Sequence, residues 1–335
     1  MIIIARRYGQ LGNRLILFAH LIAAARHYGV ELRNPCFGRY ATYFPSTRND
    51  VWCRYDRHLA RATAPLDADL ATADPPRQVI GPATHWTRSA RRGLESLCEV
   101  TTKTAYLAKL RRFPAHILRI APGEECDPLG DRFRQAVGSG RPVLVQGWRF
   151  RNASLLRQHR QPIIDFFQPD PTDRDAVERL IERARDQCDV LVGVHVRRGD
   201  YARFMGGRYY YSDADYARWM HEVEEQLPGR KVRFLICTNG QIQLDAFREL
   251  SFELGPGSMM QDLHSLARTD LLIGPPSTYT RWASFYGNVS LQSLDHRMAK
   301  IDAAVAVAEH PFDEPPTPVQ HVSDSYHSTP IARAS

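Results

Sequence analysis

The chain of 335 residues lacks long apolar runs, paired cysteines and, almost entirely, lysine. Its longest apolar segments, such as residues 1–5 and 271–273, fall far short of the ~20 residues that a membrane-spanning helix needs. The apolar start at residue 1 has no basic segment before it, so we expect no secretory signal and a cytoplasmic protein. The six cysteines form no Cys-x-x-Cys pair and no Cys/His group at zinc spacing, which predicts reduced thiols.

Arginine supplies nearly all of the positive charge, with 40 arginines against 4 lysines and a net charge of +7. A basic balance favours anionic partners such as nucleic acid, an anionic membrane or a phosphorylated small molecule. Arginine in particular suits bidentate contacts with phosphate. Peripheral contact with an anionic membrane fits this charge, although no amphipathic helix clearly indicates it.

The first half of the chain opens with a pattern typical of a nucleotide-binding unit. A buried strand over 2–5 precedes a glycine-containing loop over 8–13. A helix over 15–28 follows and ends at Gly29. Strand, loop and helix in this order indicate a Rossmann-like unit. Residues 33–85 show no clear pattern, and we expect a helix over 104–120 and a strand over 143–148.

The second half alternates strands and helices, which favours a second Rossmann-like, mostly parallel sheet. A proline-rich segment at 168–172 marks the expected domain boundary, and the composition from about residue 311 predicts a poorly ordered tail. We expect strands over 190–196, 232–237 and 270–273, and helices over 173–186, 213–227, 262–268 and 279–286.

The most informative segment is residues 193–200, Gly-Val-His-Val-Arg-Arg-Gly-Asp. It places one histidine, two arginines and one aspartate at the carboxyl end of a buried strand, where ligands of open α/β sheets bind. Because arginine is rarely buried without a partner, an anion, and most readily a phosphate, is the expected ligand. The alternative is a strand end closed by a structural Arg–Asp ion pair.

This segment, extended over residues 192–201, resembles the H-x-R-R-x-D motif of α1,2-fucosyltransferases, of which α1,6-fucosyltransferases carry variants. Residues 9–13, Gly-Gln-Leu-Gly-Asn, resemble the glycine-rich N-terminal loop of that family. Residues 146–148 with Phe166 and Phe167 resemble the segment that closes its N-terminal half. Residues 262–278 resemble its later D-x-x-x-L motif, and the motifs follow one another in the family's order.

The resemblance implies a GT-B architecture, two Rossmann-like α/β domains that face each other across a cleft. Residues 1–167 would form the acceptor-side domain, 168–310 the GDP-sugar-binding domain and 311–335 the tail. The implied enzyme is an inverting, metal-independent glycosyltransferase. Its donor is GDP-β-L-fucose, and its acceptor is a glycan hydroxyl, most readily that of a galactose that receives an α1,2 linkage. The acceptor would belong to a surface polysaccharide or a lipid-linked glycan.

The family's functional positions can be carried over one by one. Arg197 would contact the β-phosphate and stabilise the departing GDP, with Arg198 also among the donor-binding residues. His195 and Asp262 would hold the guanine. Ser277 and Thr278 would bond the diphosphate from a helix N-terminus. Gly9, Gly12 and Asn13 would let the N-terminal backbone approach the donor.

The catalytic base is less well marked than the phosphate site. Asp200 is the nearest carboxylate to the motif and is our candidate, although it also fits a structural partner of Arg198. Asp213 and Asp215 follow on the next helix. The core α1,6 enzymes have a glutamate where this chain has Met205. The chain also has Arg14 where the α1,2 group usually has glutamine, which adds a cation near the predicted cleft.

Three other functions remain open from the sequence. Asp67-Ala-Asp69 and Asp213-Ala-Asp215 fit the loose D-x-D pattern of metal-dependent GT-A enzymes. Basic segments with interleaved aromatics, at 86–92 and 148–160, fit a nucleic-acid-binding surface, although no nucleic-acid fold signature accompanies them and we expect no nucleic-acid partner. A GT-B protein that binds GDP or a glycan without transferring sugar is the third.

Overall fold

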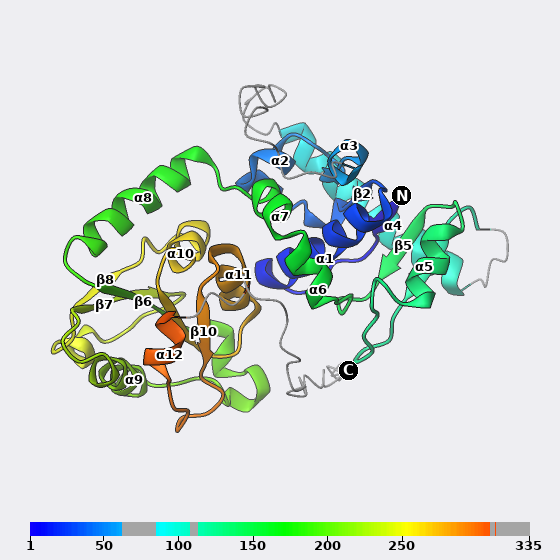
Figure 1. Cartoon of the computed structure of the whole chain (residues 1–335). Coiled ribbons are helices and arrows are strands. Elements are labelled where there is room, and N and C mark those ends of the chain that lie inside the picture. The colour runs from blue at the N-terminus through cyan, green and yellow to red at the C-terminus, as the bar shows by residue number, and fades with distance from the viewer. Residues whose placement is uncertain (62–84, 108–112, 309–311, 313–335) are drawn as a thin grey trace. The chain divides into compact units, whose positions relative to one another are not determined.

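The computed structural model describes residues 1–61, 85–107, 113–308 and 312, which belong to two compact α/β units (Figure 1). The N-terminal unit comprises Met1–Gln168 and the C-terminal unit Pro169–Pro315. Each unit contains a five-stranded, largely parallel sheet, which confirms the predicted α/β class with two Rossmann-like sheets. The predicted tail lies outside the described residues apart from Phe312, and the acceptor and donor roles of the two halves stay predictions.

The sheet of the N-terminal unit has the strand order β3-β2-β1-β5-β4. Its pairs are parallel except β2 with β3. Its strands are β1 (Ile2–Ile4), β2 (Leu32–Arg33), β3 (Arg54–Tyr55), β4 (His116–Arg119) and β5 (Val143–Gln146). Its helices are α1 (Leu11–Tyr28), α2 (Pro45–Arg48), α3 (Arg57–Arg61), α4 (His85–Leu107), α5 (Asp131–Gly138), α6 (Ala153–Gln158) and α7 (Arg160–Phe166), with short 3₁₀ turns η1 (Pro35–Phe37) and η2 (Ala41–Tyr43).

Helix α1 follows β1 as the sequence predicts, although it begins four residues earlier, at Leu11. It ends at Gly29, whose φ of 60° is left-handed and whose N–H bonds the carbonyls of Ala25 and Arg26. Phe18 is fully buried and meets Phe37 and Phe167 edge-on at ring distances of 5.4 Å each. These aromatic contacts fix α1 against segments far from it in the sequence.

The predicted helix over 104–120 is wrong. Helix α4 ends at Leu107, and His116–Arg119 is instead the strand β4, paired in parallel with β5. Pro114 explains the difference, because proline lacks the N–H that a helix interior needs and disfavours helical geometry at the residue before it. Leu118 is then 2% exposed against the sheet core.

The sheet of the C-terminal unit is fully parallel and has the order β10-β9-β6-β7-β8. The polypeptide enters this sheet at the central strand β6 and continues through β7 to the edge strand β8. It then crosses to the other side of β6, where it forms β9 and β10. This is the Rossmann order, with its topological switch point between β6 and β9. The strands are β6 (Val190–Val196), β7 (Val232–Thr238), β8 (Phe252–Leu254), β9 (Leu271–Gly274) and β10 (Ser290–Ser293).

The helices of this unit alternate with its strands, as the sequence predicts for the segments from 173 to 286. They are α8 (Pro171–Arg185), α9 (Asp213–Gln226), α10 (Met259–Leu266), α11 (Thr278–Gly287) and α12 (Ala303–Ala308). Three 3₁₀ turns accompany them, η4 (Gly199–Ala202), η5 (Phe204–Gly207) and η6 (Leu244–Phe247). None of the helices among the described residues is long and apolar enough to cross a membrane.

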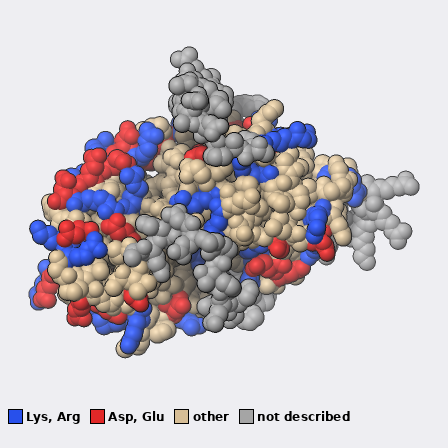
Figure 2. All heavy atoms as spheres, viewed as in Figure 1, with Lys and Arg blue, Asp and Glu red and all other residues tan. Residues whose placement is uncertain are grey.

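Arginines on and near the charged face of α8 form ion pairs with neighbouring carboxylates. Arg185 pairs with Asp270 at 2.9 Å, and Glu178 pairs with Arg268 at 3.0 Å. Figure 2 shows basic and acidic side chains side by side over this helix. The other face of α8 buries Leu180 and Ile181 in the unit. The charge run is thus a solvated helix face with compensating partners.

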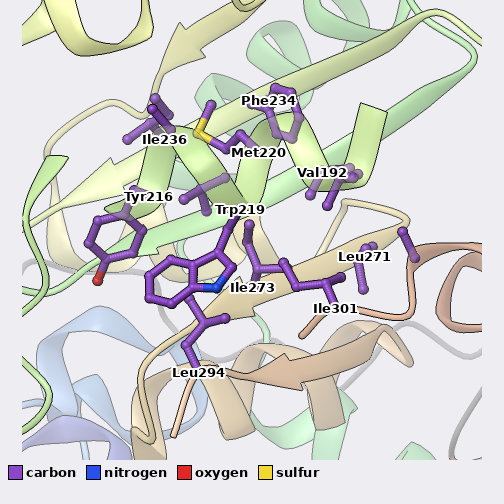
Figure 3. Close-up of a cluster of buried hydrophobic side chains, with 14 of the residues drawn as sticks. Val192, Tyr216, Trp219, Met220, Phe234, Ile236, Leu271, Ile273, Leu294 and Ile301 are labelled. Atoms are coloured by element: carbon purple, nitrogen blue, oxygen red, sulfur yellow. The ribbon is translucent and has the colours of Figure 1, made fainter. Parts of the chain in front are cut away.

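Helix α9 supplies a tryptophan to the core of the C-terminal unit (Figure 3). Trp219 is fully buried, and its Nε1–H donates to the carbonyl of Ala299 at 2.8 Å. Met220 from the same helix lies in one cluster with Phe234 of β7 and Ile273 of β9. This packing joins α9 to the sheet that carries the motif.

Replacing Trp219 should therefore destabilise the protein strongly. We expect Trp219→Ala to lower the free energy of unfolding by about 3–5 kcal/mol, since it leaves a cavity in a packed core. Trp219→Phe keeps most of the ring but loses the hydrogen bond to Ala299, and should cost less. Urea unfolding followed by circular dichroism measures both, and an alanine variant within about 1 kcal/mol of wild type would contradict the packing described.

Candidate functional site

Two groups of the predicted donor residues, Arg197 and the pair Ser277 and Thr278, lie at the switch point of the sheet of the C-terminal unit. Arg197 directly follows β6, and residues 275–278 follow β9, its neighbour. The hydroxyl of Tyr201 donates to the carbonyl of Pro276 at 2.6 Å and joins the two loops. Ligands of open parallel sheets bind outside the carboxyl ends of strands at such a point. The topology therefore places the motif where a ligand site is expected.

Arg197 is the arginine of the pair that stays at this edge. Its Nη2 lies 2.8 Å from Oδ1 of Asp200, and its guanidinium lies over the ring of Tyr201 at 5.1 Å. The side chain of Arg197 is 15% exposed and that of Asp200 is 48% exposed. Asp200 thus pairs with Arg197 and not with Arg198, the structural partner considered from the sequence.

Arg198 turns into the unit and is 7% exposed. Its Nη1 donates to the carbonyl of Tyr211 at 2.7 Å, and its Nη2 forms an ion pair with Asp213. Its backbone N–H donates to Oδ1 of Asn239 at 2.7 Å. These contacts give Arg198 a structural role in the fold, and its predicted donor contact stays a prediction.

His195 is buried one residue before the end of β6 and is 3% exposed. Burial, with the nearby charge of Arg197, lowers its pKa to about 3, so the ring is neutral at physiological pH. Its ring lies against Tyr279 of α11, with centroids 5.1 Å apart. Within the described part of the chain, its Nδ1 has no hydrogen-bond partner. A buried, neutral ring nitrogen without a partner can form a hydrogen bond with a donor or an acceptor group of a ligand.

Asp262 is the second buried polar group near this edge, at 6% exposure on α10. Its Oδ1 accepts the N–H of Gly257 at 2.9 Å. Burial raises the pKa of this carboxyl to about 6, and the bond from Gly257 opposes part of that rise. Its neighbours Cys237 and Tyr279 also have raised pKa values, mainly because both side chains are buried. Both are therefore neutral at pH 6.

Ser277 and Thr278 start helix α11. The hydroxyl of Ser277 caps the helix and accepts the N–H of Tyr279 at 3.1 Å. The remaining N–H groups of the first turn, with the positive end of the helix dipole, favour an anion. The capping role is observed, and the diphosphate role stays a prediction.

Gly9, Gly12 and Asn13 belong to the N-terminal unit, at the start of α1. Gly9 has a φ of +54°, and a Cβ there would lie 2.0 Å from Nδ2 of Asn13. Gly12 is buried in the first turn of α1. Both the left-handed backbone and the close Asn13 side chain therefore favour glycine at position 9.

The other acidic candidates have structural partners. Asp213 also accepts the N–H of Gln243 at 3.0 Å, and Asp215 forms a capping box with Ser212 at the start of α9. Asp67 and Asp69 lie outside the described residues. Across the described ranges, no group of three or more His, Cys, Asp or Glu side chains is placed to hold a metal ion, and metal independence stays a prediction.

Three residues at this site were not selected from the sequence. Tyr201 links the loops after β6 and β9, Tyr279 packs on His195, and Asn239 holds the backbone of Arg198. Tyr201 lies inside the recognised motif, and Tyr279 directly follows Ser277 and Thr278. Their positions beside predicted site residues could therefore have indicated both tyrosines. Asn239 lies in the turn after β7, and asparagine is common in turns, so the sequence offers no reason to assign it a role at the site.

The match to a known family falls on this unit. Residues 175–292 match the model of glycosyl transferase family 11. The matched segment contains β6, the Arg197–Asp200 loop, Asp262 and the start of α11. This match confirms, over these residues, the predicted resemblance to a family of glycosyltransferases.

A solved structure shares the fold. FUT1 from Arabidopsis thaliana, a mutant in complex with GDP, superposes with a TM-score of 0.51 and 14% identity over 88% of this chain and 70% of its own. The fucosyltransferase NodZ from Bradyrhizobium has a TM-score of 0.48 and 16% identity over 88% of this chain and 95% of its own. A comparison with curated protein sequences finds no match.

The buried carboxyl of Asp262 predicts a pH-dependent stability. Its folded pKa of about 6 exceeds the reference value of 3.8, so its stabilising contribution is complete at low pH and is lost as pH rises through 6. Asp262→Asn should therefore gain about 1–3 kcal/mol relative to wild type between pH 4 and pH 7. Urea unfolding at several pH values measures this difference, in which the histidine contributions cancel. A difference that does not vary with pH would contradict the assignment.

Proposed function

We propose that the protein transfers L-fucose from GDP-β-L-fucose to a glycan hydroxyl with inversion and without a metal, forming an α1,2 linkage to galactose. One observation carries the proposal: the family 11 match falls on the segment that puts Arg197 at the switch point of a Rossmann-ordered sheet. The GDP bound to the FUT1 structure supports a guanine nucleotide as the donor's leaving group.

The diphosphate is bound by Arg197 and by the N-terminus of α11. As the sugar leaves, negative charge grows on the β-phosphate oxygen. A guanidinium and helix N–H groups that are already in place stabilise this charge with little reorganisation. Arg197 is held by Asp200 and by the ring of Tyr201, so its orientation is set before the donor binds.

The guanine is held by Asp262 and His195. An ionised Asp262 accepts N–H groups of the base, while the neutral His195 offers a ring nitrogen that has no partner among the described residues. Gly9, Gly12 and Asn13 give the N-terminal backbone room to approach the donor. Uracil presents one ring N–H and lacks the exocyclic amine of guanine, so UDP binds more weakly.

Asp200 takes the proton from the acceptor hydroxyl, which attacks the anomeric carbon from the face opposite the phosphate. The carboxylate is half-exposed, so an acceptor can reach it. The acceptor is a terminal galactoside on a surface polysaccharide or a lipid-linked glycan. If Asp200 serves only as the partner of Arg197, the protein instead binds GDP or a glycan without transfer, which is the second candidate function.

GDP binding tests the donor site first. In EDTA, we expect calorimetric titration to give micromolar GDP binding and weak UDP binding. Arg197→Ala should weaken GDP binding about 10–100-fold, the effect of losing a charge-assisted hydrogen bond. Arg203→Ala, an exposed arginine of the next turn, is the matched control and should bind as wild type. Binding that needs a divalent cation, or no GDP binding, would sink the proposal.

Asp200→Asn separates the two candidate functions. As the general base, Asp200 should contribute about 10²–10⁴-fold to kcat, a larger effect than the change in GDP affinity that follows from losing its ion pair with Arg197. Initial rates with GDP-fucose and a panel of galactosides give kcat, and calorimetry gives the GDP affinity. Asp245→Asn, an exposed carboxyl on η6, is the control. Wild-type protein that binds GDP but transfers to no acceptor would favour the binding protein.

A further inference from the structure

The N-terminal unit has an arginine cluster of its own that the proposed function does not use. Arg6 and Arg7 follow β1, and Asn34 follows β2, which runs parallel to β1. The carboxyl ends of parallel strands meet at one edge of a sheet, so these residues lie together. With Tyr8 and Arg14 they line a hollow of about 10 Å³, which is the room of roughly one water-sized group.

Arg14 forms a fixed cation in the wall of this hollow. It is 7% exposed, and its Nε and Nη1 donate to the carbonyls of Gly9 and Cys36 at 3.2 and 2.9 Å. Its guanidinium also lies over the ring of Tyr40 at 5.0 Å. Burial lowers the pKa of Arg14, and the nearby charge of Arg7 contributes. A cation held this firmly is arranged to receive an acceptor atom.

Asn34 supplies an unused acceptor in the same hollow. Its backbone N–H donates to the carbonyl of Trp52 at 2.8 Å, so the residue is anchored. Its side chain is 3% exposed, and its Oδ1 has no hydrogen-bond partner within the described ranges. A buried amide oxygen without a donor is destabilising, and a ligand that donates to it would remove this penalty.

The mouth of the hollow carries excess positive charge. Arg6 and Arg7 are exposed, and Arg7 is paired with Glu95 of α4 at 3.3 Å. Burial raises the pKa of Glu95. Arg6, Arg7 and Arg14 line the hollow, while Glu95 and the nearby Glu99 supply two negative charges, so an excess of positive charge remains that favours an anion.

We propose that this hollow binds an acidic sugar of the acceptor, a proposal that rests on the proposed transferase function. A sugar hydroxyl enters the hollow, donates to Oδ1 of Asn34 and accepts from Arg14, while the neighbouring carboxylate pairs with Arg6 and Arg7. A phosphate oxygen can accept from Arg14 but has no proton for Asn34. Oδ1 of Asn34 needs a hydrogen-bond donor, and the arginines need an anion. A uronic acid supplies both groups, whereas the diphosphate of the donor supplies only the anion.

The experiment compares an acidic and a neutral acceptor on the full chain. The probes are a galactose–glucuronate disaccharide and lactose, titrated by calorimetry in the presence of GDP. We expect wild type to bind the acidic disaccharide at least about tenfold more tightly, as one charge-assisted hydrogen bond would give. The double variant Arg6→Gln/Arg7→Gln should bring the ratio near one, and Asn34→Leu should weaken the acidic disaccharide.

Controls separate this site from the donor site and from the fold. Arg134→Gln removes an exposed arginine on α5 and should keep the wild-type ratio. Arg6→Gln, at an exposed position, keeps the test available if Asn34→Leu does not fold. Equal binding of both disaccharides by wild type would overturn the proposal. Loss of GDP affinity in the arginine variants would also overturn it and assign the anion to the donor.

The two proposals can fail separately. Selective binding of the acidic disaccharide without transfer to any galactoside would reject the transferase and retain the acidic-sugar site. The opposite result is transfer to neutral galactosides together with equal rates of transfer to acidic galactosides by wild type and by the Arg6→Gln/Arg7→Gln variant. It would retain the transferase and reject the site.

Discussion

Two adjacent arginines at the end of one buried strand need different partners, and the C-terminal unit is arranged around this requirement. Arg198 is buried, and its charge is neutralised by Asp213 and by the carbonyl of Tyr211. A buried guanidinium without such partners would cost several kcal/mol. Arg197 remains at the edge, paired with the half-exposed Asp200. The fold thus neutralises one cation inside the unit and holds the other at the edge of the sheet, where we propose that the diphosphate binds.

The same requirement fixes the start of helix α9. Asp213 is its first residue, and the capping box of Ser212 and Asp215 sets where the helix begins. From that start, Trp219 falls on the face that packs on the sheet, and its indole N–H reaches Ala299. The ion pair beneath the site and the core of the unit therefore depend on one helix register.

The sequence predicted the parts whose signals are local. The apolar run 190–196 and the strand–loop–helix over 2–28 carry clear periodicity, and both are found. Residues 33–61 form two-residue strands and short turns with no periodic signal. They are held by Arg91, which donates to the carbonyls of Thr47 and Asp50 at 2.7 and 3.1 Å, a contact between distant segments. Spacing likewise gave no means to tell which aspartate pairs with Arg198.

Arginine richness also has a structural meaning that composition alone does not reveal. Arg14, Arg91 and Arg198 are buried, and each donates to main-chain carbonyls. A guanidinium can do this because it is planar, offers five donors and is weakly hydrated, whereas the compact lysine ammonium holds its water strongly. In both units a buried arginine stabilises the loop that carries more exposed ones, Arg198 beside Arg197 and Arg14 near Arg6 and Arg7. The buried cation restricts the backbone, so the less buried arginine of the same loop would lose less conformational entropy on binding the proposed anion.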